Sequence, residues 1–140
     1  MRPRISDPRI GIFFSGNELF SPEYDQAKGL YFTNRWRLEP VDEEAYKRGE
    51  LVEPKKPIVF YVDNNFPEEW KAAIKEGVLE WNAVFEKIGF KNVMRALDFP
   101  KDDPEFDPDN LKYSCVRYAP TWTTNAMGPS WTDPRSGEII

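Results

Sequence analysis

The sequence predicts an α+β fold in which one long helix packs on a β-sheet. The run Ile58–Val62 is β-branched and aromatic throughout, which is typical of a strand that a sheet buries on both faces. Residues 68–88 then contain no proline and repeat apolar side chains at helical spacing. Further β-prone segments follow at 90–97 and 113–118. Since a strand, helix, strand unit crosses over right-handed, the strands at 58–62 and 90–97 should be parallel.

The first part of the chain is expected to contribute two short strands. Arg9–Phe14 is apolar and β-prone, and it lies between Pro8 and the turn signal Ser15-Gly16-Asn17. Leu30–Leu38 alternates between two faces, one mainly apolar and the other bearing arginines and Thr33.

The segment 39–56 is the best candidate for a domain boundary. It is rich in Glu, Lys and Pro, a composition that favours an exposed linker. A helical turn is expected inside it at 42–48, and Gly49 should stop that turn.

The long helix is expected to begin near Phe66. Asn65 and Glu68 have the spacing of a capping box, Pro67 is tolerated in a first turn, and Gly89 suits the position just after the last turn. Six large apolar residues recur at spacings of 4, 4, 3, 4 and 3, so they share one stripe: Trp70, Ile74, Val78, Trp81, Phe85 and Ile88. A helix with this pattern packs on a sheet, and the stripe is therefore predicted to be core.

The remainder of the chain alternates between expected strands and loops. Residues 98–110 form an acidic, proline-rich loop, and Tyr113–Tyr118 is the next strand. A loop rich in Thr, Asn, Gly and Trp follows. Thr132–Ile140 has the pattern of a turn that enters a further strand, and we expect the chain to be a piece of a longer polypeptide because it stops within that strand.

The histidine and cysteine counts exclude many kinds of active site. The 140 residues include no histidine and one cysteine, so a Ser-His-Asp triad, a Cys-His dyad, a His-containing zinc or haem site and a Cys-rich zinc site cannot form. A metal could be held only by oxygen ligands. Nucleophile motifs and glycine-rich phosphate loops are also absent. Cys115 lies in an expected strand without an imidazole partner, and it is predicted to be inert.

Charge and hydropathy argue against two classes of partner. The net charge is -5 and the pI is about 4.9, so nucleic acid is not an expected partner. No apolar run approaches the roughly 20 residues of a membrane span. Residues 1–8 do not lead into an apolar signal core, so any export signal would lie upstream.

The acidic loop 98–110 is a weak candidate for calcium binding. Its carboxylates recur at close intervals: Asp98, Asp102, Asp103, Glu105, Asp107 and Asp109. An EF-hand template begun at Asp103 puts Pro108 where a glycine belongs and Ser114 where a bidentate glutamate belongs, so the template fails. A solvated loop is favoured, and weak calcium binding stays open.

The late aromatic loop, residues 118–131, supplies the candidate substrate-binding residues. Aromatic rings on a loop can stack on a sugar or grip a peptide. Trp122, Asn125, Gly128 and Trp131 are the residues named for this role. The alternative is a small lid tucked onto the sheet.

Separated blocks, none of them a catalytic signature, run through most of the chain in a definite order. They are Arg35–Glu39, Pro57–Asp63, Gly77–Trp81, Ala83–Phe90 with Lys91-Asn92, Asp102–Pro104, Tyr113-Ser114, Val116–Tyr118, Asn125-Ala126, Gly128-Pro129 and Asp133–Ile139. In their order and spacing, from Asp7 to the end, the chain resembles a family of large bacterial zinc-dependent metalloproteases of the metzincin-like class.

The resemblance implies a fold and a division of the chain. Residues 57–140 would be the N-terminal, upper subdomain of a zincin-like protease domain, a twisted mixed β-sheet backed by one long helix in the order β-α-β-β-β and truncated in the last strand. Residues 1–56 would be the tail of a preceding domain and its linker. The edge strand that begins near Ile139 would line the cleft and pair with an extended peptide or protein substrate. A secreted, periplasmic or cell-envelope location is implied as well.

The zinc site of such enzymes lies on an H-E-x-x-H helix, which this sequence does not contain. No catalytic residue and no metal ligand is therefore assigned to this chain, and zinc is expected only in the full-length protein. The first hypothesis is an inactive fragment of a zinc metalloprotease. The others are a non-catalytic module that binds glycan or peptide through loop 118–131, and an interaction domain without a pocket. An exposed edge strand could also pair with a second copy.

Overall fold

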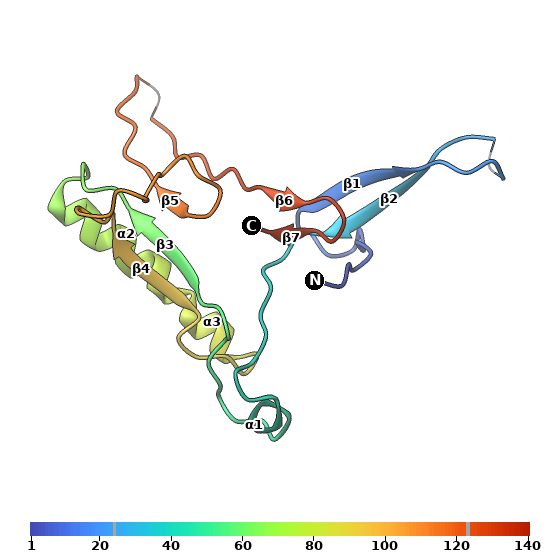
Figure 1. Cartoon of the computed structure of the whole chain (residues 1–140), viewed down its shortest axis with the longest axis horizontal. Helices are drawn as coiled ribbons and strands as arrows, with labels where there is room; N and C mark the ends of the chain where they lie inside the picture. The colour runs from blue at the N-terminus through green and yellow to red at the C-terminus, as the bar shows by residue number, and fades with distance from the viewer. Residues whose placement is uncertain (24, 123) are drawn as a thin grey trace. The chain divides into compact units, whose positions relative to one another are not determined.

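The computed structural model describes residues 1–23, 25–122 and 124–140, which form two compact units. The first unit comprises residues 1–37 and 126–140, and the second unit comprises residues 38–125. Figure 1 shows the order of the elements along the chain. The fold is α+β, as predicted, with several small sheets.

A hairpin of two strands dominates the first unit. β1 (Phe14–Leu19) and β2 (Lys28–Thr33) are antiparallel, with Phe14 opposite Thr33. The ring of Phe14 meets the ring of Tyr31 edge-on, with 5.2 Å between centroids. Ile5 makes an isolated antiparallel bridge to Phe32, so the N-terminal segment also pairs with β2.

The predicted position of the first strand is wrong. Ser15-Gly16-Asn17, interpreted as a turn, lies inside β1 and pairs with β2. Cross-strand contacts override the turn preference of these residues, because the Ser15 hydroxyl donates to the side-chain oxygen of Asn34 (2.7 Å) and the Tyr31 ring lies beside Gly16.

A second hairpin completes the first unit. β6 (Thr132–Asp133) and β7 (Glu138–Ile139) are antiparallel, and Arg35 exchanges backbone hydrogen bonds with Gly137 and Ile139, each at 3.0 Å. The strand expected at the end of the chain is therefore present. The family resemblance implied that it shares one sheet with Ile58–Val62, but it pairs within the first unit instead.

The second unit contains a parallel three-stranded sheet in the order β4-β3-β5. β3 (Ile58–Val62) lies between β4 (Met94–Asp98) and β5 (Ser114–Val116). The resemblance implied a mixed sheet, but both strand pairs of this sheet are parallel. The parallel pairing of the strands at 58–62 and 90–97 is confirmed.

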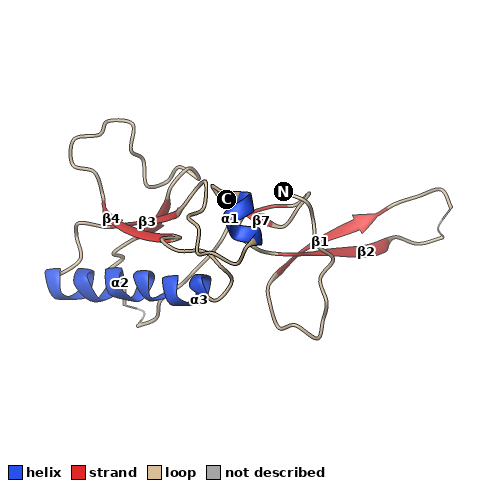
Figure 2. Ribbon diagram, turned by 90° about the horizontal axis from the view of Figure 1, so that it is seen from below, coloured by secondary structure: helices blue, strands red, loops and turns tan. Residues whose placement is uncertain are grey.

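One helix of 19 residues lies along a single face of this sheet (Figure 2). It is formed by α2 (Glu68–Glu80) and α3 (Asn82–Glu86), which continue through Trp81. The expected capping box is absent, because the N-cap is Pro67 and no side chain caps the helix. Asn65 instead donates its backbone N–H to Asp63 at 2.9 Å, in the turn that leaves β3. Gly89 follows the helix with a φ of 90°, as predicted.

The segment 39–56 is folded onto the second unit and is not a free linker. It contains the expected helical turn, α1 (Glu43–Lys47), which Asp42 caps and which ends before Gly49 at a φ of 84°. Val52 makes a parallel bridge to Phe90, and the rings of Tyr46 and Phe90 lie 5.0 Å apart. These contacts explain why an apparently polar segment is ordered.

All of the buried apolar side chains among the described residues belong to the second unit. They are Ala45, Val52, Ile58, Val62, Phe90, Val93 and Met94. The core thus includes residues of α1 and of the segment after it, together with both ends of β3 and the start of β4. Burial of this kind is the main favourable contribution to folding.

The helix stripe predicted to be core is only partly so. Ile74, Val78 and Phe85 are half-buried, whereas Trp70, Trp81 and Ile88 are more than half exposed. The helix is rotated so that Lys71, Lys75 and Asn82 also lie on its half-buried side. Asn82 explains part of this rotation, since its side-chain amide donates to Met94 O (3.1 Å) and accepts from Met94 N (2.8 Å).

Candidate functional site

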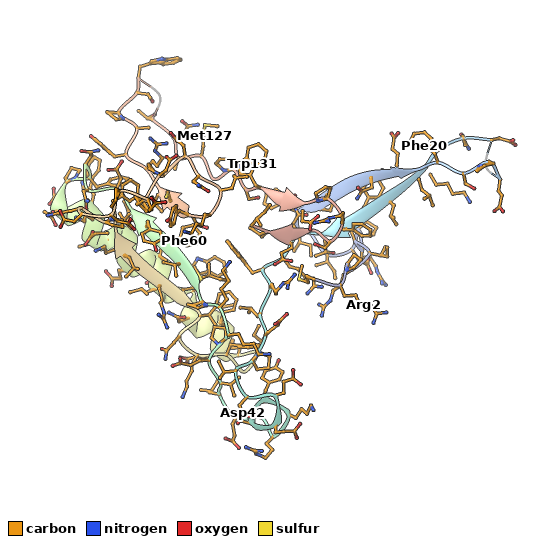
Figure 3. All side chains as sticks on the ribbon, viewed as in Figure 1. Arg2, Phe20, Asp42, Phe60, Met127 and Trp131 are labelled. Carbon is orange, nitrogen blue, oxygen red and sulfur yellow. The ribbon has the colours of Figure 1, made fainter. Side chains whose placement is uncertain are left out.

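The four predicted substrate-binding residues are all exposed, and no hydrogen bond or ring contact joins any two of them among the described residues. Trp122 and Asn125 belong to the second unit, and Gly128 and Trp131 belong to the first unit. The Trp122 side chain is 93% exposed. Trp131 lies in the loop segment directly before β6, and Figure 3 labels it. Residue 123 of this loop lies outside the described residues, and the assignment of a substrate site to the four stays a prediction.

Tyr118, at the start of the same loop, is anchored to the parallel sheet. Its ring contacts that of Phe66 with 5.1 Å between centroids, and its backbone N–H donates to Asp63 at 3.3 Å. Asp63 is 6% exposed and also accepts from the backbone N–H of Asn65. Ligands of α/β proteins often bind at the carboxyl ends of parallel strands, where Asp63 lies. Its two oxygens, however, already bind backbone N–H groups, so this carboxylate has a structural role.

A charged cluster of Asp98, Lys71 and Lys75 lies at the same end of the sheet and was not predicted from sequence. The carboxylate of Asp98 lies 3.0 Å from the Lys71 ammonium and 2.8 Å from that of Lys75. Lys71 is largely covered, with 12% of its side chain exposed. The signal available in the sequence was a pair of lysines four residues apart at the border of the apolar stripe.

The pKa shifts show that this cluster holds its charges. The hydrogen bond from Lys75, helped by that from Lys71, keeps the pKa of Asp98 below its usual value. The hydrogen bond to Asp98 raises the pKa of Lys71. Both shifts favour the ionised forms of Asp98 and Lys71, and the ion pairs of this cluster join α2 to β4.

Four aromatic rings pack the acidic loop onto the sheet. Tyr61 of β3 contacts Phe106 and Tyr113 with centroid distances of 5.1 and 5.5 Å, and Phe106 contacts Phe99 and Tyr113 at 5.0 and 4.7 Å. Aromatic pairs at these separations contribute beyond their buried area. The loop is therefore anchored by Phe106, which the interpretation as a solvated loop did not foresee.

The carboxylates of the acidic loop are used in local turns. Asp103, Asp107 and Asn110 each accept the backbone N–H two residues further on, at 3.0, 2.9 and 2.9 Å, and Asp109 pairs with Arg117. Among the described residues, no group of three or more His, Cys, Asp or Glu side chains lies close enough to hold a metal. The described residues therefore do not fit a zinc site, and calcium binding by this loop gains no support.

Cys115 lies in β5, as predicted, and is half-buried. Burial is the main cause that raises the pKa of its thiol. A thiol held in the protonated form is a poor nucleophile, which agrees with an inert residue.

The outer edge of β5 is an edge of the parallel sheet that no described strand occupies. Val116 O accepts from Asp63 N at 3.0 Å, so Val116 directs its backbone toward β3. Because backbone groups alternate along a parallel ladder, Cys115 and Arg117 direct theirs away from β3. No described strand pairs with this edge.

Residues 1–41 match the family model of DUF5117, a domain of unknown function. No curated protein and no solved structure matches the chain. No metalloprotease family is identified.

The DUF5117 match covers the N-terminal part of the first unit and ends inside the segment 39–56. The expected domain division at residue 56 stays a prediction. In the part of the chain that the structure describes, no helix is long and apolar enough to cross a membrane.

Proposed function

We propose that this chain is part of a zinc-dependent metalloprotease, in which its second unit supplies scaffold for the substrate cleft. The proposal rests first on the sequence resemblance, which spans most of the chain. The observation that supports it in the structure is the arrangement of β4-β3-β5 with one 19-residue helix along a single face. A sheet backed by one long helix is what the resemblance implies for residues 57–140.

In this proposal the chain binds peptide through backbone groups and performs no chemistry by itself. The edge of β5 would pair with an extended segment, either a further strand of the protease or a substrate peptide. Its half-buried neighbours Tyr113 and Tyr61 make that edge rigid through their ring contact. Zinc, where the full-length protein binds it, would supply the activated water that attacks the peptide bond.

The experiment compares this chain with a longer polypeptide from the same reading frame. We expect this chain to bind no stoichiometric zinc by calorimetry and to cleave no casein or fluorogenic peptide. The longer polypeptide should contain an H-E-x-x-H sequence and cleave peptide in a manner that a zinc chelator abolishes. Tight one-to-one zinc binding by the present chain, or a frame that ends without such a helix, would contradict the proposal.

Exposed aromatic side chains support a second candidate, a non-catalytic binding module. Trp122, Met127 and Trp131 expose 93, 83 and 67% of their surfaces, and large apolar side chains with such exposure are often used for binding. Titration with glycan and peptide libraries tests this candidate. A ligand whose affinity falls at least about tenfold in Trp122→Ala or Trp131→Ala supports the module, and the absence of any ligand leaves the protease proposal alone.

The location and the assembly follow from the first proposal. A protease of this kind would act outside the cytoplasm or at the cell envelope. A second copy of the chain could occupy the open edge of β5 when no other strand does. Sedimentation at several protein concentrations would detect such a dimer.

A further inference from the structure

An exposed apolar stripe runs along one flank of the long helix of the second unit, beside the face that contacts the sheet. Trp70, Trp81, Val84 and Ile88 expose 54, 58, 51 and 55% of their surfaces. Trp70, Trp81 and Val84, at spacings of 11 and 3 residues and about 100° per residue, lie within one narrow strip of the helix that is about 21 Å long at 1.5 Å per residue. Ile88 follows two residues after the end of α3. We call these four residues the tryptophan stripe.

The tryptophan stripe is distinct from the face that contacts the sheet. Lys71, Ile74, Lys75, Val78, Asn82 and Phe85 form the half-buried face. On the helical wheel this face is centred about a quarter turn away from the stripe. The half-buried face is thus mixed, with three apolar and three polar side chains, and the tryptophan stripe beside it stays exposed.

A row of acidic side chains runs along the other border of the stripe. Glu69, Glu76 and Glu80 are exposed and lie on the border opposite the sheet, followed by Lys87. No ion pair joins the three glutamates to any described part of the chain. Glu76 and Glu80 are four residues apart and repel each other, which weakens the isolated helix. A cationic partner would remove this repulsion.

A notch interrupts the stripe at Gly77. This residue lies on the same strip, seven positions after Trp70 and four before Trp81. A Cβ at Gly77 would meet nothing within 4 Å, so no contact inside the described chain requires a glycine there. Glycine lowers helix stability relative to alanine. The open space at this position leaves room for a side chain from outside.

We propose that the tryptophan stripe docks a basic amphipathic helix of a partner protein. The apolar strip fits the apolar face of such a helix, the notch accepts one of its large side chains, and the glutamates pair with lysines or arginines on its flank. The charge of the second unit favours this choice, with twelve Lys and Arg residues against eighteen Asp and Glu. The same charge disfavours an anionic membrane or nucleic acid at this face.

The test uses two synthetic peptides of about 20 residues and the full chain. One peptide carries leucines on one helical face and lysines on both flanks, and the other replaces every lysine with glutamate. Titration followed by tryptophan fluorescence should show binding of the lysine peptide that weakens as salt rises. The glutamate peptide should bind at least about tenfold more weakly. Equal affinity for the two peptides would overturn the proposal.

Variants of the chain locate the binding surface. Trp81→Ala should weaken binding of the lysine peptide about tenfold or more. The double variant Glu76→Lys, Glu80→Lys keeps the apolar surface and should weaken it severalfold, with loss of the salt dependence. Circular dichroism verifies that each variant retains its helix.

Leu79→Ala is the matched control, because Leu79 is 43% exposed on the same helix but lies opposite the stripe. It should leave peptide affinity unchanged. An equal loss of affinity in Leu79→Ala would show nonspecific binding and overturn the proposal. A chain that sediments as a dimer and becomes monomeric in Trp81→Ala would assign the stripe to a second copy, which also overturns it.

Discussion

Each of the two units of this chain is stabilised internally by a different kind of interaction. The second unit contains every buried apolar side chain among the described residues, including Val62 and Val93, which are fully buried. In the part of the first unit that the structure describes, no large apolar side chain is buried to that extent. Its strands are joined by backbone pairing and by polar groups such as Glu138, whose carboxylate lies 2.7 Å from Arg37.

This difference shows that two small units of one chain can be stabilised differently, one by buried apolar side chains and the other by backbone pairing and polar contacts. A two-stranded hairpin alone is marginally stable in water. The first unit adds side-chain hydrogen bonds between its hairpins, where the Ser15 hydroxyl lies 2.9 Å from that of Thr132 and Asn17 donates to Pro134 O at 3.1 Å. Such bonds each contribute modestly. We therefore expect the second unit to be the more stable of the two.

The largest effect should come from removing an aromatic ring in the core of the second unit. Phe90 is 4% exposed and packs on Tyr46, so Phe90→Ala should lower the free energy of unfolding by about 3–5 kcal/mol. Phe14→Ala is the matched change in the first unit, where the ring is 55% exposed, and it should cost about 1 kcal/mol. Urea unfolding followed by circular dichroism measures both. Equal losses would remove the contrast between the units.

In the first unit, the largest loss of stability on substitution is expected at a glycine. Gly137 has a φ of 70°, and a Cβ there would lie 2.4 Å from the backbone oxygen of Thr33. Gly137→Ala should therefore cost about 2 kcal/mol or more through strain and displacement of the β6–β7 turn. Gly11→Ala, whose Cβ would meet nothing within 4 Å, is the control and should change stability by less than about 0.5 kcal/mol. Hydrogen exchange at Arg35 and Ile139 would report the local loss.

A smaller and pH-dependent effect is expected at Asp98. Its pKa is lowered in the folded state, so its contribution is complete above the pKa of the unfolded chain, about 3.9, and is lost as pH falls through the folded value. Asp98→Asn should lower the melting temperature at pH 7, and the difference from the parent chain should shrink as the pH falls into the acid range. Glu86→Gln, at an exposed helix position, should behave like the parent chain throughout this range. A constant difference across this range would show that the ion pairs are not the cause.

The smallest effect on stability is expected at Trp122. A side chain 93% exposed contributes almost no buried surface, so Trp122→Ala should leave the unfolding free energy within about 0.5 kcal/mol. A larger loss would mean that the aromatic loop is a lid on the sheet, the alternative interpretation of that loop.

The strongest local patterns predicted the second unit well. The run Ile58–Val62, the proline-free helix and the glycines at 49 and 89 each combine several signals that favour the same structure. The first unit was less predictable because its pairings join residues far apart in sequence. Nothing near Glu138 indicates that it pairs beside Arg35, and the turn preference of Ser15-Gly16-Asn17 opposes the strand it forms.

The helix shows the limit of periodicity most clearly. Spacing placed six apolar residues on one stripe, but the orientation of the helix is set by polar contacts with β4. Asn82 and the two lysines that bind Asp98 face β4. The helix is therefore rotated about its axis, and Trp70 and Trp81 are exposed. The charged cluster at Asp98 was missed for the same reason, since its partners come from elements more than 20 residues apart.

The side-chain amide of Asn82 has a consequence for how the parallel sheet can grow. By binding both the N–H and the carbonyl of Met94, it occupies the place on the outer side of β4 that a neighbouring strand would need. Met94 is the first residue of β4, so the amide hinders pairing of an incoming strand at that end of the edge. The helix therefore protects the start of this margin of the sheet against unwanted partners.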